Sequence, residues 1–273
     1  MAQNYKEMRM SGRDARKYAK GISLMNKQAD ALRVAGLLPD VFEASKSARE
    51  VKPAQDTESK PTPVDILNNA VREFNASSLT PELVTKTFQT IWKVRGESAG
   101  VEVVIPPCDR SAEELVELVK AGRRIGYLPE QVMTQKDRPL FAKMFPRLGS
   151  HSVKEGNSVT NEANRFGWFD YEASIDAPYL DTTEDQLRER ITADGRLEMN
   201  VSEYIVAGED SKLFTGKFLD HGNTWARLLG SRDDGEVVNA GFRSGGDLRV
   251  GWSLDPQYRL PDLGGRSVGV KKA

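Results

Sequence analysis

Cysteine and histidine are scarce in this chain of 273 residues, which contains one cysteine and two histidines. The single cysteine, Cys108, excludes an intrachain disulfide and is compatible with a reducing compartment. Because Cys108 follows the apolar run 101–105 and has no evident activating neighbour, we interpret it as a packing residue rather than a nucleophile. His151 and His221 have no second ligand at a metal-binding spacing, so we expect no metal site and no cofactor.

Long hydrophobic runs and an excess of charge of one sign are also missing. No stretch approaches the length of a membrane span, and the N-terminus lacks the apolar centre of a signal peptide. We therefore expect no membrane span and a cytoplasmic location, with an export route that needs no cleavable signal left open. Lys and Arg number 39 and Asp and Glu 40, for a net charge of -1. This balance does not favour nucleic acid as a partner.

Catalytic motifs are equally sparse. The chain has no phosphate-binding P-loop, no dinucleotide-binding glycine motif and no GxSxG nucleophile elbow. The glycines of GGDLRVG and LGGRSVG lack the strand-to-helix context that phosphate binding needs. The EPN and QPD tripeptides that calcium-dependent lectins use for sugars are absent as well. We expect no catalytic residues and interpret the protein as not being an enzyme.

Four segments follow from composition and periodicity. Residues 1–44 are predicted to be helical, with one helix from Ser11 to Ala35. Residues 45–63 hold several prolines and few large apolar residues, which predicts a flexible linker. Residues 64–97 contain two further helices and are interpreted as a helical connector to the main domain, 98–273. The N-terminal helices either dock on that domain or mediate oligomers, possible homo-oligomers among them, because an amphipathic helix of this length is marginal alone.

The main domain is predicted to combine helices with irregular strands, an α+β arrangement. We expect a strand at 101–105, a helix after the capping residue Ser111, and two short helical pieces within 127–145. The aromatic run at 166–174 is interpreted as a core strand, with a ligand-stacking platform as the alternative. Two helices are expected at 182–191 and 200–213, then a strand at 225–229. A final strand at 263–270 is expected beside the first strand of the domain.

Residues 231–262 carry the most regular apolar pattern in the chain. Val238, Ala240 and Phe242 alternate with polar or small residues, and a second run alternates in the same way through Leu248, Val250, Trp252 and Leu254. A period of two predicts half-buried strands, and SGGD at 244–247 supplies the glycines of a hairpin loop. We therefore expect a β-hairpin with an inward apolar row and an outward polar row.

The outward row and the adjoining loops show a restriction in residue type. No lysine occurs between Lys217 and Lys271. These positions also hold no Glu, Gln, Met or Trp, and all of these missing types lack a codon that ends in a pyrimidine. The restriction is either chance on an ordinary solvent face or the mark of a face drawn from NNC and NNT codons. The candidate ligand-binding positions are Arg232, Asp233, Asp234, Asn239, Gly241, Arg243, Ser244, Asp247, Arg249, Gly251, Ser253, Tyr258, Arg259 and Asp262.

These features, with WARLLGS at 225–231 and LGGRSVGVKK at 263–272, resemble the variable target proteins of diversity-generating retroelements, including uncharacterised proteins of candidate-phylum bacteria. The resemblance covers roughly residues 98–273. In that family a reverse transcriptase mutates template adenines, so that AAC and AAT codons become varied codons in the gene. The resemblance implies a C-type-lectin-like fold, close to that of formylglycine-generating enzymes, which displays the diversified residues as a ligand-binding surface. Those enzymes use a pair of active-site cysteines, which this chain lacks.

We therefore expect a non-catalytic protein that binds an unknown ligand, most simply another protein, through a hypervariable face. The strongest contacts are predicted at Tyr258, Arg259, Arg243, Arg249 and Arg232, with polar determinants at Asn239 and Asp247. Two alternatives stay open. One is an enzyme of the formylglycine-generating-like fold with converging ionisable groups away from the hairpin. The other is a helical adaptor or oligomerisation protein that acts through the N-terminal segment.

Overall fold

The computed structural model describes residues 61–132, 140, 143–145, 159–243, 246–252 and 255–271. The predicted helix Ser11 to Ala35 and linker residues 45–60 lie outside this range. Short local signals set the ends of the described helices. Ser111 and Glu114 form a capping box at one helix, and Asn200 with Glu203 form another. The helices are α2 (Pro63–Ala76), α3 (Pro81–Ala99), α4 (Ala112–Lys120), α6 (Glu184–Ala193) and α7 (Val201–Thr215).

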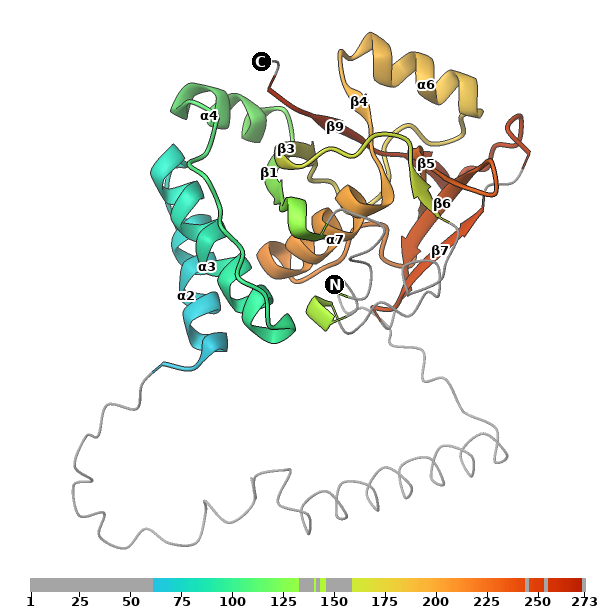
Figure 1. The fold of residues 1–273 in the computed structure, drawn as a ribbon. Coiled ribbons are helices and arrows are strands. Elements are labelled where there is room, and N and C mark those ends of the chain that lie inside the picture. Colours follow the sequence, from blue (N-terminus) through green and yellow to red (C-terminus); the bar gives the residue numbers. More distant parts are fainter. Residues whose placement is uncertain are drawn as a thin grey trace, which may run out of the picture. The chain divides into compact units, whose positions relative to one another are not determined.

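Two sheets accompany these helices (Figure 1). The first has the strand order β1-β3-β9-β4, and all its pairings are antiparallel. The second has the order β2-β5-β6-β7, and β8 pairs in parallel with β5. The predicted α+β class is confirmed. The strands are β1 (Arg123–Leu128), β2 (Thr160–Asn161), β3 (Gly167–Glu172), β4 (Leu197–Glu198), β5 (Trp225–Asp233), β6 (Glu236–Phe242), β7 (Leu248–Trp252), β8 (Leu263–Gly265) and β9 (Ser267–Gly269).

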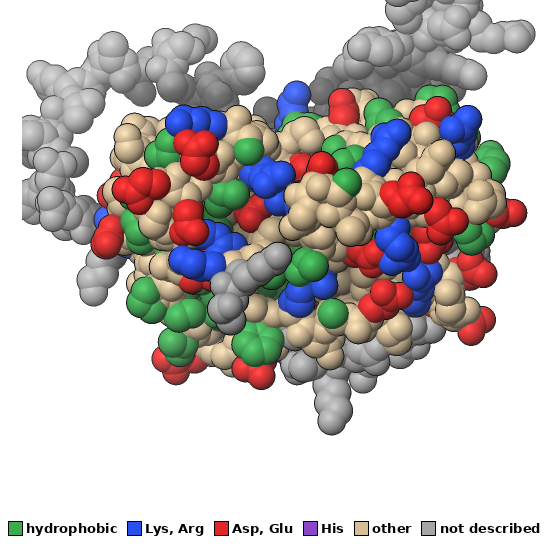
Figure 2. Space-filling model, turned by 90° about the horizontal axis from the view of Figure 1, so that it is seen from above, with side chains coloured by type: hydrophobic (Ala, Val, Ile, Leu, Met, Phe, Trp, Pro, Cys, Tyr) green, Lys and Arg blue, Asp and Glu red, His purple; other side chains and the backbone are tan. Residues whose placement is uncertain are grey.

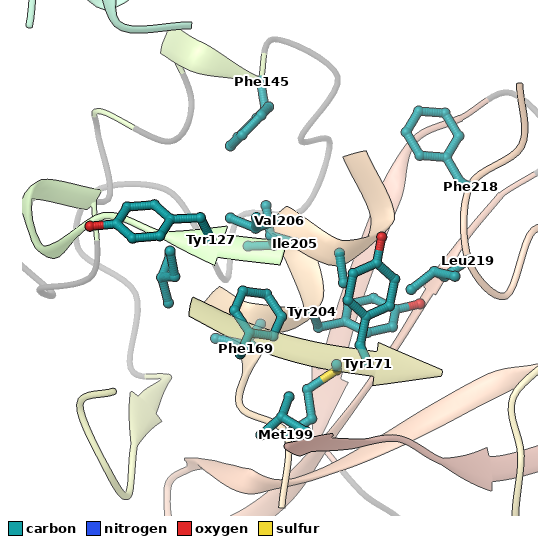
Figure 3. Packing of buried hydrophobic residues seen from close by; sticks show 14 of the residues in the cluster. Tyr127, Phe145, Phe169, Tyr171, Met199, Tyr204, Ile205, Val206, Phe218 and Leu219 are labelled. Atoms are coloured by element: carbon teal, nitrogen blue, oxygen red, sulfur yellow. The ribbon is translucent and has the colours of Figure 1, made fainter. Parts of the chain in front are cut away.

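Helix α7 is the central element of the core. It contacts strands of both sheets, β1 in the first and β5 in the second, and most of its side chains are buried. Figure 3 shows aromatic and aliphatic side chains meeting there, including Tyr127 of β1, Phe169 and Tyr171 of β3, and Tyr204 of α7. The aromatic run in β3 is therefore a core strand, as predicted.

The helices at 64–97, predicted as a connector, share this core. Phe74 of α2 and Phe88 of α3 belong to the same buried cluster as Trp168 of β3. The ring centroids of Phe88 and Trp168 lie 5.3 Å apart in an edge-on arrangement. Helix α2 already begins at Pro63, the last residue of the predicted linker. The chain from Lys60 onward divides from the N-terminal segment as one unit that includes both helices.

The predicted strand at 101–105 is wrong. The segment is extended and its side chains alternate in burial, but it pairs with no strand in the described part of the chain. It runs beside α3, where the Gln89 side-chain amide donates a hydrogen bond to the Ile105 carbonyl oxygen at 3.2 Å. Ile105 is buried, whereas Val104 is exposed. The alternation of residues in the sequence indicates a half-buried extended segment. It does not indicate whether a partner strand is present.

Two other expectations need correction. The stretch 127–145 was predicted to be helical from its start, yet Tyr127 and Leu128 belong to β1 and pair with β3. The final segment 263–270 forms two short strands in different sheets rather than one strand, because Arg266 separates them. Its second part, β9, lies between β3 and β4. β9 therefore pairs with neither the segment 101–105 nor β1.

On the face of the molecule seen in Figure 2, basic and acidic side chains are interspersed rather than gathered by sign. Among the described residues, no helix combines the length and the apolar character needed to cross a membrane.

Candidate functional site

The β5–β6–β7 sheet has an inner row of side chains that is buried. Val238 and Ala240 of β6 and Leu248 of β7 are 0% exposed, Phe242 is 2% exposed and Val250 is 6% exposed. The register places Ala240 opposite Val250 and Phe242 opposite Leu248. The predicted inward row is confirmed at these positions. The side chains of Trp252 and Leu254 lie outside the described part of the chain.

The same register defines a second row on the other side of the sheet. We call it the outer row, and its members are Asn239, Gly241, Arg249 and Gly251. Asn239 lies opposite Gly251 and Gly241 lies opposite Arg249. Residues directly opposite each other in an antiparallel pair point to the same side of the sheet. The structure therefore brings these four candidate positions together. Arg249 is exposed, Asn239 and Gly251 are partly buried, and Gly241 is buried.

Arg243 and Asp247 extend the outer row at the β6–β7 hairpin. The Arg243 backbone N–H donates a hydrogen bond to the Asp247 carbonyl oxygen at 2.9 Å, and both residues are exposed. Among the described residues, no carboxylate forms an ion pair with the Arg243 guanidinium. Ser244 and Ser253, two other candidate positions, lie outside the described residues.

The loop 255–262 adds three more candidate positions beside the outer row. Tyr258 is 45% exposed, and Arg259 and Asp262 are also exposed. The Trp225 N–H donates to the Asp262 carbonyl oxygen at 2.8 Å, which ties the end of the loop to β5. Arg259 Nε lies 3.8 Å from Asp181 Oδ1, a solvent-exposed ion pair.

A buried arginine, Arg227, holds this loop against the sheet. It lies opposite Asn239 and so on the outer side of β5, yet its side chain is fully buried. Its guanidinium donates to the Thr182 carbonyl oxygen at 2.8 Å and to the carbonyl oxygen of Tyr258. Burial lowers the pKa of Arg227. The loop therefore packs beside β5, while Arg249 of β7 remains exposed.

The remaining candidates, Arg232, Asp233 and Asp234, lie at the β5–β6 turn, at the other end of β6. Arg232 Nε is 2.6 Å from Glu162 Oε1, and its Nη1 is 3.3 Å from Glu184 Oε1. Asp233 is buried at 7% exposure, and Asp234 has a φ of 52° in the turn. These three are thus separate from the outer row, and Arg232 is engaged by two carboxylates.

Two exposed residues within 231–262 do not share the restriction in residue type. Glu236 begins β6, and Gln257 lies in the loop beside Tyr258. Neither residue type has a codon ending in a pyrimidine. The restriction therefore applies to the candidate positions and does not extend to every exposed residue of this region, which makes Glu236 and Gln257 fixed positions under the same hypothesis.

A small cavity opens at the hairpin end of the outer row. It measures about 310 Å³ and is lined by Asp220, Gly222, Thr224, Trp225, Gly241, Phe242 and Arg243. Our sequence analysis missed Trp225 and Thr224 as lining residues. Trp225 could have been found, because it alternates with Ala226 in β5 and so shares the outer side with Arg227.

Asp220 is the acidic group of this cavity, and its carboxylate is already engaged. Arg266 binds it through two contacts, Nε to Oδ2 at 2.8 Å and Nη2 to Oδ1 at 3.0 Å. The hydroxyls of Tyr204 and Thr224 also donate to it, at 2.9 and 2.7 Å. Asp220 and Arg266 are both fully buried. This carboxylate therefore orders the chain and has no free acceptor role in proton transfer.

A second group of ionisable side chains lies inside the core, away from the hairpin. Arg95 Nη2 of α3 is 2.7 Å from Asp210 Oδ1 of α7, and burial raises the pKa of Asp210. Burial also raises the pKa of Tyr171, and the nearby Asp210 charge adds to this rise. The neighbouring Arg124 side chain acts in the opposite direction and lowers the pKa of Tyr171. Asp210 and Tyr171 are fully buried, so neither contacts solvent.

Residues for metal or thiol chemistry are not assembled in the described part of the chain. No group of three or more His, Cys, Asp or Glu side chains there has metal-binding geometry. His221 packs against the Phe218 ring at 6.4 Å, and His151 lies outside the described residues. Burial raises the pKa of Cys108, which packs against the hydrophobic core.

The geometry thus offers an outer row that includes the exposed Arg249, with an adjoining loop and cavity, held on a buried inner row. Comparisons with family models, with curated proteins and with solved structures find no match to this chain.

Proposed function

We propose that the protein is a non-catalytic ligand-binding protein whose outer row, β6–β7 hairpin and loop 255–262 form a hypervariable surface. The observation that carries the proposal is that the same strands bear two rows of side chains with different surroundings. The inner row, which includes Val238 and Leu248, is buried, and the outer row faces away from that core. Exposed substitutions away from special features change stability by about 0.5 kcal/mol or less. Such a face can vary while the fold persists.

The loop 255–262 supports the same role through a different device. Its position depends on backbone atoms, namely the carbonyl oxygens of Tyr258 and Asp262, which accept hydrogen bonds from β5. The side chains of Tyr258 and Arg259 are not needed for those contacts. A change of residue at either position therefore keeps the anchoring and alters only what the surface presents.

The chemistry of the surface suits a protein ligand. Tyrosine and arginine supply most of the energy at protein interfaces, while asparagine, serine and glycine adapt to the partner. Tyr258, Arg243 and Arg249 are exposed on this face beside Asn239 and Asp247. The converging ionisable groups at Asp210 and Tyr171 do not favour the enzyme alternative, because both side chains are fully buried.

For the fold, we propose the C-type-lectin-like arrangement that the resemblance implies. In support, β3 leads into α6 and α7, and the last strand, β9, returns to pair with β3. In the sequence, the β6–β7 hairpin of the second sheet lies between β3 and β9. For diversification, we propose the mechanism of the retroelement family, with adenine-directed changes at the candidate codons.

Sequencing the DNA beside the gene tests the proposal. We expect a reverse-transcriptase gene and a near-copy of the 3′ end that differs at adenines in the codons for Arg243, Arg249 and Tyr258, and that keeps the adenines of the Asn239 codon. Codons for Val238, Ala240, Glu236 and Gln257 should match between the copies. A neighbourhood without the near-copy, or differences that fall on the inner row, would show that the proposal is wrong.

A further inference from the structure

The cavity at the hairpin end of the outer row has one aromatic surface. Trp225 contributes this surface and is partly exposed. Phe242 also borders the cavity, but its ring belongs to the inner row, is 2% exposed and stacks on Phe218 in the core with centroids 4.4 Å apart. With a volume of about 310 Å³, the space accepts a single side chain of a partner. The Trp225 ring offers such a group an aromatic surface to pack against.

The charge of the cavity is positive on balance. The carboxylate of Asp220 lines it but is neutralised by the two contacts from the buried Arg266. Arg243 also lines it, is exposed, and has no ion pair among the described residues. An exposed arginine favours an anionic group at this edge of the cavity.

The lining mixes positions of two kinds. Trp225, Thr224 and Phe242 lie outside the candidate variable set, whereas Gly241 and Arg243 belong to it. Trp225 and Phe242 therefore stay in place while two positions at the edge change. This division of fixed and variable residues is what an anchor subsite shared by many variants requires, because the apolar contact is retained and the neighbouring contact selects the ligand.

We propose that this cavity is an anchor subsite for an aromatic side chain of a protein ligand that carries a carboxylate close to the ring, either on the next residue or at the chain end. The ring packs against Trp225, and the carboxylate pairs with the Arg243 guanidinium. The inference rests on the proposed function, in that this face is taken to be the one that binds.

Gly241 controls the depth of the subsite. A Cβ atom at position 241 would lie 3.3 Å from Trp225 Cε3 and 3.3 Å from the Thr224 carbonyl oxygen. Such spacing is tighter than ordinary van der Waals contact, so a side chain there must occupy the space that the ring of the ligand would fill. Diversification at this position therefore opens or closes the subsite.

The test uses a small probe and the full chain. Titration with 3-phenylpropanoate, followed by NMR of the indole N–H signals, should give saturable shifts of the Trp225 signal with a Kd on the order of 1 mM. The Trp225 signal is identified by its loss in Trp225→Phe. The matched cation 3-phenylpropylamine should bind about two- to fivefold more weakly, because an exposed ion pair contributes little. Arg243→Gln should remove that preference.

Variants within β6 provide the control for the position of the probe. Gly241→Val should abolish the saturable shift, whereas Glu236→Val, on the same strand but away from the cavity, should leave it unchanged. If Gly241→Val does not fold, as judged by circular dichroism, Gly241→Ala replaces it and should weaken binding. An unsaturable response in the parent chain, or equal effects of Gly241→Val and Glu236→Val, overturns the subsite.

The two proposals can fail separately. Probe binding with the expected pattern in a gene that has no neighbouring template copy supports the subsite and overturns diversification. A template copy without probe binding overturns the subsite alone.

Discussion

Arg227 of β5 donates a hydrogen bond to the backbone carbonyl oxygen of Tyr258, across the space between the sheet and the loop 255–262. The arginine is fully buried, while the residue whose backbone it holds is 45% exposed. A fixed interior side chain thus positions an exposed aromatic residue through its backbone carbonyl. The hydrogen bond that positions the loop therefore does not depend on which side chain residue 258 carries.

Replacing Arg227 with methionine should release the loop. The variant loses the hydrogen bonds to Tyr258 and Thr182, but it also removes a guanidinium whose Nε has no partner among the described residues. We expect the free energy of unfolding to fall by about 1–3 kcal/mol, and amide hydrogen exchange to become faster in 255–262. The control is Arg249→Met on the exposed face, for which about 0.5 kcal/mol or less is expected. Unchanged exchange in the loop would contradict the role given to Arg227.

The buried pair Asp220 and Arg266 should be among the most sensitive sites in the chain. Removing either partner leaves an uncompensated buried charge, so we expect Arg266→Met to lower the free energy of unfolding by about 3–5 kcal/mol in urea titrations. The exposed pair Lys86 and Glu73 serves as the comparison, and Lys86→Met should cost about 1 kcal/mol or less.

Substitutions at Asp220 itself give a second test, because this residue has a φ of 52°. Asparagine tolerates that left-handed backbone better than alanine does. Asp220→Asn should therefore be less destabilising than Asp220→Ala. Equal losses in the two variants would mean that the backbone conformation contributes nothing to the choice of residue.

Gly241 and Gly251 of the outer row should respond differently to the same substitution. A Cβ at position 241 would be 3.3 Å from Trp225 and Thr224, whereas at position 251 its nearest contact is Asn239 Oδ1 at 3.7 Å. Alanine in a strand is favoured over glycine by about 0.5–1 kcal/mol where space allows. Gly251→Ala should therefore be neutral or stabilising, and Gly241→Ala destabilising, in thermal unfolding. Equal melting temperatures would contradict the crowding at 241.

The reactivity of Cys108 should be low and should depend on pH. Burial raises the pKa of this thiol, so the folded chain holds the proton more tightly than the unfolded chain. Its contribution to stability is then complete below the pKa of the unfolded thiol and is lost as the pH rises through that of the folded one. Labelling with a disulfide reagent at pH 8 should be slower than in urea-unfolded protein. Labelling as fast as in urea would indicate an activated thiol.

Local signals explain why much of the secondary structure could be predicted. Ser111, Thr183 and Asn200 each precede a helix and bond the backbone N–H three residues on, which is a property of four consecutive residues. The hairpin could likewise be predicted from alternation and a glycine loop. The prediction of a strand at 101–105 was wrong because a strand also needs a neighbouring strand. This segment has the sequence pattern of a strand, but it pairs with none among the described residues.

The candidate site could be predicted in part for the same reason. The alternation of apolar and polar residues was sufficient to predict Asn239, Arg249 and Gly251, because residues that face each other on neighbouring strands point to the same side of the sheet. It did not reveal that Gly241 is buried or that Arg232 is held by Glu162 and Glu184, because those facts arise from elements far away in the sequence. An arginine such as Arg227 or Arg266 looks like a surface residue until its carbonyl and carboxylate partners are in place.

The short strands after the loop set a downstream limit on mutation. A Cβ on Gly264 would lie 2.2 Å from the Pro178 carbonyl oxygen, and one on Gly265 would lie 2.4 Å from Leu187. Arg266 follows at once with its buried partner Asp220. Side chains at these positions would therefore be expected to destabilise the product within two codons of Asp262. If the proposed diversification operates, it must spare the codons after Asp262, either because they lack adenines or because selection removes the products that carry changes there.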